Sequence, residues 1–304
     1  MRAVLLLGLG LSLLAACTRE GVTPQPDGDV DEEFPYPEPR TDVIAAVGSE
    51  ATLEIATWNI RNFPEGAETA RLVADVISSL DVDIIIVEEI ASDAAWKELL
   101  DRLRGHAGVL STHRYSPNEY QKIGIIYRES LVTVGTPELL FPTDSFNFPR
   151  PPFSIPITVD ANTIELVGVH LKAGRAPEDA DRRRAAAIAL DAHLRAQVDG
   201  GGEPEVVILG DYNERVVDAA DREVLAPLLT APDRYTVRTE APAQGGAVSY
   251  LGFGGSFIDH ITTTAALDAR WTAATIQLPH VEQAVPSYSS LVSDHVPVVL
   301  VTAR

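Results

Sequence analysis

Acidic, amide and imidazole side chains follow short apolar segments at several widely separated places in this chain. The clearest case is residues 206–209, four apolar residues that lead into Gly210, Asp211, Tyr212 and Asn213. A short β-branched segment that ends at a glycine is typical of a buried strand. These side-chain types can bind divalent cations and move protons. The same order recurs where apolar segments lead into Asn59, Glu88 with Glu89, and His170.

Two later segments have the reverse order, with the polar residues first. Asp259 and His260 precede one apolar segment, and Asp294 and His295 precede another. If these last two strands run antiparallel to the earlier ones, every polar group falls on one rim of the sheets. Ligands of sheet proteins collect at such rims, outside the strand ends. The sequence therefore predicts a single site built from distant segments.

The elements that must position this site are mostly strands. Helical spacing of apolar residues predicts helices over residues 65–80, 92–103, 178–198 and 221–229. Because helices separate only some of the strands, we expect mixed sheets with helices outside, in one domain. Strands are expected at residues 52–58, 84–87, 123–127, 131–140, 155–159, 163–170, 206–210, 257–264, 270–277 and 296–302.

The charge of the chain restricts the class of partner. The 304 residues carry a formal net charge of −20. Such a surface repels polyanions at long range, which argues against tight, non-specific nucleic-acid binding. It does not exclude a nuclease, because turnover needs only a local positive patch or a bound cation.

The N-terminal residues indicate export. Arg2 precedes the apolar residues 3–14, which are too few to span a bilayer. Small residues before Cys17 resemble a bacterial lipoprotein signal, with a generic export signal as the alternative. We therefore expect a signal peptide at 1–17 ending at a lipidated Cys17, an exported protein, and a lipid anchor to the outer membrane or cell surface. Cys17 is the only cysteine, so no intramolecular disulfide forms.

Residues 18–50 are rich in proline and acids, a composition typical of a disordered tether. The folded domain is expected to cover residues 51–304.

Six short blocks along residues 52–302 are similar to the signature of the endonuclease/exonuclease/phosphatase superfamily, and in particular to its pancreatic-type deoxyribonuclease-like branch. The resemblance implies a four-layer α/β/β/α sandwich, with two packed mixed sheets flanked by helices. It also implies cleavage of phosphoester bonds that depends on Mg²⁺ or Mn²⁺. The blocks are residues 57–60, 87–89, 168–170, 210–213, 258–260 and 293–295.

The resemblance assigns roles to these residues. It implies that Glu89 binds the metal, that Asn59 orients Glu89 or touches the metal, and that Asp294 is a ligand or lies just behind the ligands. His295 would be the general base, held by Asp259. Asp211 would bind the metal's water shell or orient the nucleophile, and Asn213 would donate to a phosphate oxygen.

A second group is expected to act on the phosphate. His170 matches a histidine of the deoxyribonuclease-like branch that acts on the phosphate or leaving group. A glutamate can orient that histidine in the branch, and the resemblance places Gln121 at the corresponding position here. Arg150 resembles a phosphate-contacting arginine, and Lys172 is placed two residues after His170. Gln121 cannot stabilise an imidazolium with a full charge.

The leading interpretation is an exported nuclease with nucleic acid as its substrate, no protein partner, and a monomeric state. A lipid phosphodiesterase of the sphingomyelinase kind and an inositol-polyphosphate phosphatase use the same residues. A lipid enzyme would need an exposed aromatic hairpin, for which residues 141–153 are the candidate. A catalytically inactive binding module is a further alternative, although the expected carboxylate and histidine are both present.

Overall fold

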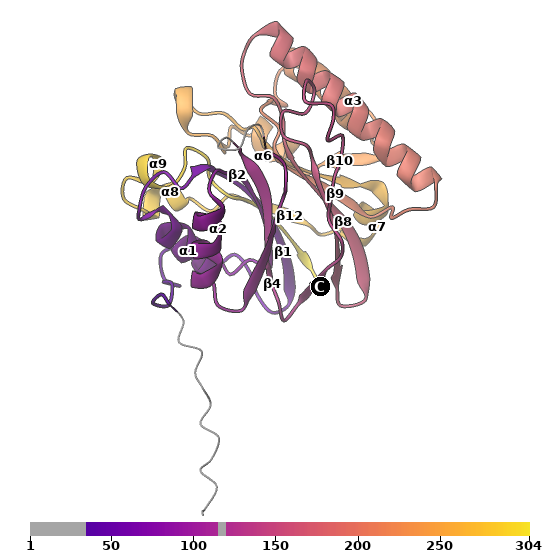
Figure 1. Cartoon of the computed structure of the whole chain (residues 1–304). Helices are drawn as coiled ribbons and strands as arrows, with labels where there is room; N and C mark the ends of the chain where they lie inside the picture. Colours follow the sequence, from indigo (N-terminus) through magenta and orange to yellow (C-terminus); the bar gives the residue numbers. More distant parts are fainter. Residues whose placement is uncertain (1–34, 115–119) are drawn as a thin grey trace, which may run out of the picture. The chain divides into compact units, whose positions relative to one another are not determined.

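Two β-sheets pack face to face in the computed structural model, which describes residues 35–114 and 120–304 (Figure 1). The first sheet has the order β12 (Thr275–Gln277), β13 (Val298–Ala303), β1 (Thr52–Phe63), β2 (Ile84–Ile90), β4 (Lys122–Arg128) and β3 (His106–Leu110). The second has the order β10 (Tyr235–Val237), β11 (Asp259–Thr264), β9 (Val206–Asp211), β8 (Asn162–His170), β7 (Phe153–Val159) and β5 (Val132–Val134), and β6 (Glu138–Leu139) pairs with β7.

Both sheets are mixed, as predicted. β1 is parallel to β2 and β8 is parallel to β9, while the other strand pairs are antiparallel. The expected reversal of the last two polar segments is confirmed, because β13 runs antiparallel to β1 and β11 runs antiparallel to β9. The polar ends of these strands therefore lie at the same rim.

Helices cover the outer face of each sheet and complete four layers (Figure 1). On the first sheet, α1 (Thr69–Leu80) and α2 (Asp93–Arg102) bury Val73, Ile77 and Trp96 against Trp58. On the second, α3 (Pro177–Asp199) buries Leu190 and other apolar residues. The remaining helices are short: α4 (Ala219–Val224), α5 (Ala226–Leu229), α6 (Glu240–Gln244), η1 (Gly252–Gly254), α7 (Ala265–Arg270), α8 (Val281–Ala284) and α9 (Tyr288–Leu291).

Several predicted elements differ in extent. The strand expected at 131–140 is interrupted and forms β5 and β6. The strand expected at 270–277 shrinks to β12, because α7 ends at Arg270 and a turn at residues 272–273 precedes Thr275. The helix expected at 221–229 is divided into α4 and α5, and Pro227 lies at the start of α5, where a proline is tolerated. Strand β3 was not predicted.

The segment before Ala51 contacts the folded domain, which corrects the predicted tether boundary for residues 35–50. Val43 and Val47 pack on the core beside α1. The Val43 amide donates to Ser79 Oγ at 3.1 Å, and the Val47 amide donates to the Leu80 carbonyl at 2.9 Å. The apolar residues of this segment outweigh the disordering effect of its prolines, because they cover exposed core.

The predicted signal peptide at 1–17, Cys17 and the rest of the predicted tether up to residue 34 lie outside the described residues. Within the described part of the chain, none of the helices combines the length and apolar character that a bilayer crossing requires.

Candidate active site

Strand alternation places the polar residues at the end of the interface between the two sheets. Ile55 faces the opposing sheet, so Asn59, four residues later on β1, shares that face. Asn59 pairs with Glu88 of β2 in the first sheet. Asp211 of β9 lies between its two partners, His170 of β8 and Asp259 of β11, in the second sheet.

Glu89 reaches the same place through an irregularity in the strands. Simple alternation would turn Glu89 to the face opposite Glu88, but the pairing of β2 with β1 and β4 shifts register here. Glu89 has φ of 65°, a left-handed conformation that a side chain rarely adopts. Its Oε2 accepts the Asn62 amide at 2.9 Å. Both acids of the pair therefore point toward the site, although strict alternation would turn one of them away.

Asn59 holds two carboxylates together. Its Nδ2 donates to Glu89 Oε1 and to Asp211 Oδ2, each at 3.2 Å. Asn213 fixes Asp211 from the other side. Its backbone amide donates to Asp211 Oδ1 at 2.8 Å, and its side-chain Nδ2 donates to Asp211 Oδ2 at 3.0 Å. Asn213 Nδ2 also donates to the Leu171 carbonyl at 3.2 Å, so the side-chain amide of Asn213 serves to orient Asp211 in this arrangement.

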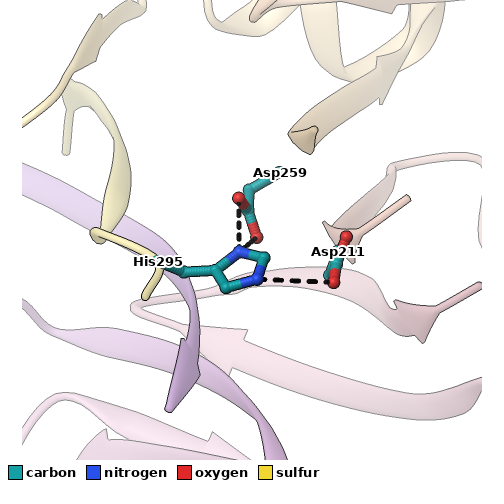
Figure 2. A group of neighbouring side chains, drawn as sticks. All are labelled: Asp211, Asp259 and His295. Carbon is teal, nitrogen blue, oxygen red and sulfur yellow. Dashed lines mark hydrogen bonds and ion pairs between the residues drawn. The ribbon is translucent and has the colours of Figure 1, made fainter. Parts of the chain in front are cut away.

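His295 lies between two carboxylates (Figure 2). Its Nδ1 is 2.9 Å from Asp259 Oδ2 and 3.1 Å from Asp259 Oδ1. Its Nε2 is 3.9 Å from Asp211 Oδ2 and points toward it. A carboxylate on Nδ1 fixes the imidazole tautomer and leaves Nε2 directed at the site. The adjacent His260 points away and contacts Thr239 and the Glu214 carbonyl.

Residues that the sequence did not single out hold the His295 segment. Ser293 Oγ donates to the Asn59 carbonyl at 2.6 Å and accepts the His295 amide at 3.0 Å. Ser249 Oγ accepts the Asp259 amide at 3.1 Å, and the Ser249 carbonyl accepts the Val296 amide at 2.8 Å. Only Ser293, next to Asp294, lies inside a recognisable block, so sequence reasoning had no signal for Ser249.

Electrostatics in this cluster favour positive charge. Burial lowers the pKa of His295, but Asp259, Asp211 and Asp294 outweigh it and raise this pKa to about 10. Burial raises the pKa of Asp211 to about 7, which His295 opposes and Asp259 reinforces. Burial also raises the pKa of Glu88 well above its usual range, although Thr57 Oγ1 donates to Glu88 Oε1 at 2.7 Å.

The residues present fit a divalent cation. One ligand atom each from Asp211, Asp259 and His295 lies within 4.8 Å of the others, a spacing that could hold a metal ion. Glu89 Oε1 and Asp211 Oδ2 share the amide of Asn59 and add further oxygens. Several buried carboxylates facing one another gain from a positive charge, and hard oxygen ligands suit Mg²⁺ or Mn²⁺.

His170 is fully inside the site as a neutral imidazole. Its Nε2 is 3.5 Å from Asp211 Oδ2 and 3.7 Å from Glu89 Oε1. Burial lowers the pKa of His170 well below its usual range, and the nearby Arg150 charge adds to this effect. Among residues 35–114 and 120–304, no hydrogen-bond partner faces His170 Nδ1.

Gln121 does not take the expected place beside His170. Its Oε1 accepts hydrogen bonds from Nε and Nη2 of Arg150, and its Nε2 donates to Asn62 Oδ1 at 2.6 Å. Gln121 therefore connects Arg150 to Asn62, whose amide donates to Glu89. A glutamine suits this position because it can accept from Arg150 and donate to Asn62 at the same time.

The structure leaves two predicted residues outside this cluster. Lys172 Nζ is 2.9 Å from Asp179 Oδ1 in the first turn of α3. Asp294 is partly exposed, and its Oδ1 is 3.9 Å from Arg61 Nε. Asp294 contributes charge to His295 but does not belong to the group of metal-binding geometry.

The sequence comparison agrees with this geometry. Residues 56–295 match the Endonuclease/Exonuclease/phosphatase family, and this range includes every residue of the cluster. The chain belongs to this family. No protein in a search of curated sequences matched the chain.

Several solved structures have a similar fold. The D. rerio TDP2 complexed with single strand DNA product has 16% identity and a TM-score of 0.62, with 83% of this chain and 99% of that one covered. A 3'-5' exonuclease from Neisseria meningitidis has 20% identity and a TM-score of 0.59, covering 83% and 100%. A mannosyl-6-phosphatase from Bacteroides thetaiotaomicron has 14% identity and a TM-score of 0.58, covering 82% and 98%.

Proposed function

We propose that this protein is an exported, lipid-anchored hydrolase that cleaves phosphodiester bonds of nucleic acid with a divalent cation, Mg²⁺ or Mn²⁺. The observation that carries the proposal is the convergence of Glu89, Asp211 and the Asp259–His295 pair at one rim. Family membership supports phosphoester chemistry. Similar folds bound to DNA, such as the D. rerio TDP2 complex, support a nucleic-acid substrate.

The acidic residues and the histidine of the cluster have different roles in the proposed reaction. Glu89 and Asp211 hold the cation, and Asn59 and Asn213 fix the positions of these carboxylates. When bound, the cation supplies a Lewis acid that neutralises charge developing on the phosphate. His295 accepts the proton of the attacking water through Nε2 while Asp259 holds Nδ1–H.

His295 must be neutral to accept a proton. Without a cation, the surrounding carboxylates raise its pKa to about 10 and favour the imidazolium form. A cation held by the same carboxylates would lower that pKa and so favour the neutral imidazole. The neutral His170 directs Nε2 toward Asp211 and Glu89 in the same cluster, where it can donate to a phosphate oxygen.

The loop at residues 141–153 does not form the exposed aromatic hairpin that a lipid phosphodiesterase would need. Among the aromatic residues of 141–153, Phe148 and Phe153 are buried, and Phe141 stacks on Phe148 with ring centroids 4.7 Å apart. Only Phe146 is exposed. One exposed ring is a small surface for membrane insertion, so this loop does not favour a sphingomyelinase-like function.

A substrate panel tests the proposal. The full chain is incubated with single-stranded DNA, plasmid DNA, RNA, sphingomyelin and an inositol polyphosphate, each with Mg²⁺, Mn²⁺ or EDTA. We expect cleavage of nucleic acid with either cation and none with EDTA. Turnover of only the lipid or the inositol substrate would contradict the nuclease assignment, and no turnover of any of them would support the inactive binding module.

Export and lipidation are tested separately. Radiolabelled palmitate should be incorporated into the wild-type chain expressed in a bacterium and should be absent from Cys17→Ser. Equal labelling of both chains, or none of the wild type, would contradict the lipid anchor.

A further inference from the structure

The loop at residues 250–255 is attached to the segment that carries His295. Tyr250 forms antiparallel bridges with both Ser256 and His295. The Leu251 amide donates to the Asp294 carbonyl at 2.7 Å. The base of this loop therefore has a fixed position relative to the catalytic histidine.

The loop backbone runs across a ring that packs on His295. The rings of Tyr250 and His295 have centroids 4.9 Å apart. A Cβ atom added to Gly252 would lie 2.4 Å from the Tyr250 hydroxyl, so only glycine allows this approach. Phe253, the next residue, is thereby held at the rim of the site.

Phe253 is the most exposed large apolar side chain of the described residues, at 83%. Its φ is 51°, and Gly254 and Gly255 follow at 89° and 85°. A bulky residue in this left-handed region raises the free energy of the folded state. Burial does not offset that cost, because the Phe253 side chain is 83% exposed. Strain of this kind is typical of segments that contact ligands.

Arg175 covers one side of the Phe253 ring. Its Cζ lies 4.7 Å from the ring centroid, in the segment between His170 and helix α3. The pair thus combines an aromatic face with a positive charge, and the Arg175 charge acts on Tyr250, whose ring packs on His295. Phe253 and Arg175 are far apart in the chain, so no local pattern indicates an aromatic platform here.

We propose that Phe253 and Arg175 form a stacking subsite for an unpaired nucleobase next to the scissile phosphate. The inference rests on the proposed function and specifies its substrate as single-stranded nucleic acid. An aromatic ring stacks on any base regardless of sequence, and Arg175 attracts the adjoining phosphate. Bases inside a duplex are already stacked, so duplex DNA gains less from this subsite.

Binding measured without turnover tests the subsite. The full chain in EDTA is titrated with a fluorescent single-stranded oligodeoxynucleotide and with an oligomer of the same length whose residues are abasic. We expect the wild type to prefer the oligomer with bases by about tenfold or more. Phe253→Ala should abolish this preference, and Phe253→Trp should keep it. Phe253→Leu, which keeps apolar bulk without a ring, should behave like Phe253→Ala.

Phe146→Ala is the matched control. Phe146 is also exposed, at 57%, and has Arg182 over its ring at 4.6 Å, but it lies in the 141–153 loop rather than in the loop attached to His295. This variant should retain the preference for bases. Equal losses in Phe146→Ala and Phe253→Ala, or an unchanged preference in Phe253→Ala, would overturn the subsite.

Two further measurements separate the competing explanations. Loss of binding to phosphatidylglycerol vesicles in Phe253→Ala, with the base preference unchanged, would assign the ring to a membrane surface and overturn the proposal. Cleavage of the same oligomers with Mg²⁺ is followed in parallel. Base-dependent binding without any cleavage would contradict the proposed function and still support the subsite.

Discussion

Among single residues, the pair of Asp259 and His295 would determine, in the proposed function, how the site moves a proton. Both Asp259 oxygens lie within 3.1 Å of His295 Nδ1, so this carboxylate is engaged by the histidine. Asp211 and Glu89 are the remaining acids whose carboxylate oxygens can turn toward a cation. The three acids thus have different roles, although all reach one rim.

Asp259→Asn should separate these roles. The amide keeps the shape of the side chain but cannot support an imidazolium with a full charge, so the proton-accepting step is weakened. We expect nuclease turnover to fall by about 10² or more, with little change in Mg²⁺ affinity. Cleavage rates across a Mg²⁺ titration measure both quantities. An unchanged rate combined with weakened Mg²⁺ affinity would assign Asp259 to the metal instead.

At the scale of elements, the close contact between β8 and β9 positions His170 against Asp211. Gly210 has φ of 145°, and a Cβ there would lie 1.8 Å from the Val169 carbonyl oxygen. Gly210→Ala should therefore lower the free energy of unfolding by about 3 kcal/mol. Gly66→Ala is the control, because its Cβ meets nothing within 4 Å. Similar urea midpoints for both variants would be inconsistent with this packing.

Helix α3 is connected to the site by a buried ion pair. Arg183 Nε is 2.9 Å from Glu214 Oε2, and Arg183 Nη1 donates to the Lys172 carbonyl at 2.8 Å. Arg183 is buried although it lies among three consecutive arginines near the start of α3.

Arg183→Met leaves the Glu214 carboxylate buried without its partner. We expect the free energy of unfolding to fall by about 3 kcal/mol. Arg184→Met, which removes a more exposed ion pair with Glu223, should change it by less than about 0.5 kcal/mol. Chemical denaturation of the two variants compares them, and equal stabilities would show that the pair contributes little.

At the scale of the whole molecule, the start of the domain carries a pH-dependent contribution to stability. Burial raises the pKa of Glu54 to about 7, and the neighbouring Asp83 carboxyl adds to the rise. The folded state therefore binds a proton more tightly than the unfolded state does. This contribution to stability is fully present at pH values below the ordinary pKa of glutamate, and it is lost as the pH rises toward 7.

Glu54→Gln should remove that dependence. Between pH 5 and pH 8 the wild type should lose about 1–2 kcal/mol of unfolding free energy relative to the variant, after allowance for solvent screening. Urea unfolding at both pH values measures the difference, and Glu50→Gln, at an exposed neighbour, serves as control. A wild type that gains stability relative to Glu54→Gln at high pH would contradict the assignment.

Much of this architecture is predictable because apolar strands and their polar ends are local patterns. The mixed sheets, the shared rim and the cluster of Asn59, Glu89, Asp211 and His295 all follow from them. Contacts between distant segments are not local, so the partner of Gln121, the clamp by Ser249 and the exposed Phe253 were missed. Short elements such as β3 and α7 depend on tertiary packing rather than on periodicity.

We propose that His295 at this rim accepts the proton of the attacking water in metal-dependent cleavage of nucleic acid. The most direct measurement is the rate at which the full chain cleaves single-stranded DNA with Mg²⁺, compared among wild type, His295→Ala and His260→Gln. We predict that His295→Ala lowers the rate by about 10²–10⁴ with little change in melting temperature, and that His260→Gln, which points away, retains most activity. Full activity in folded His295→Ala would contradict the account.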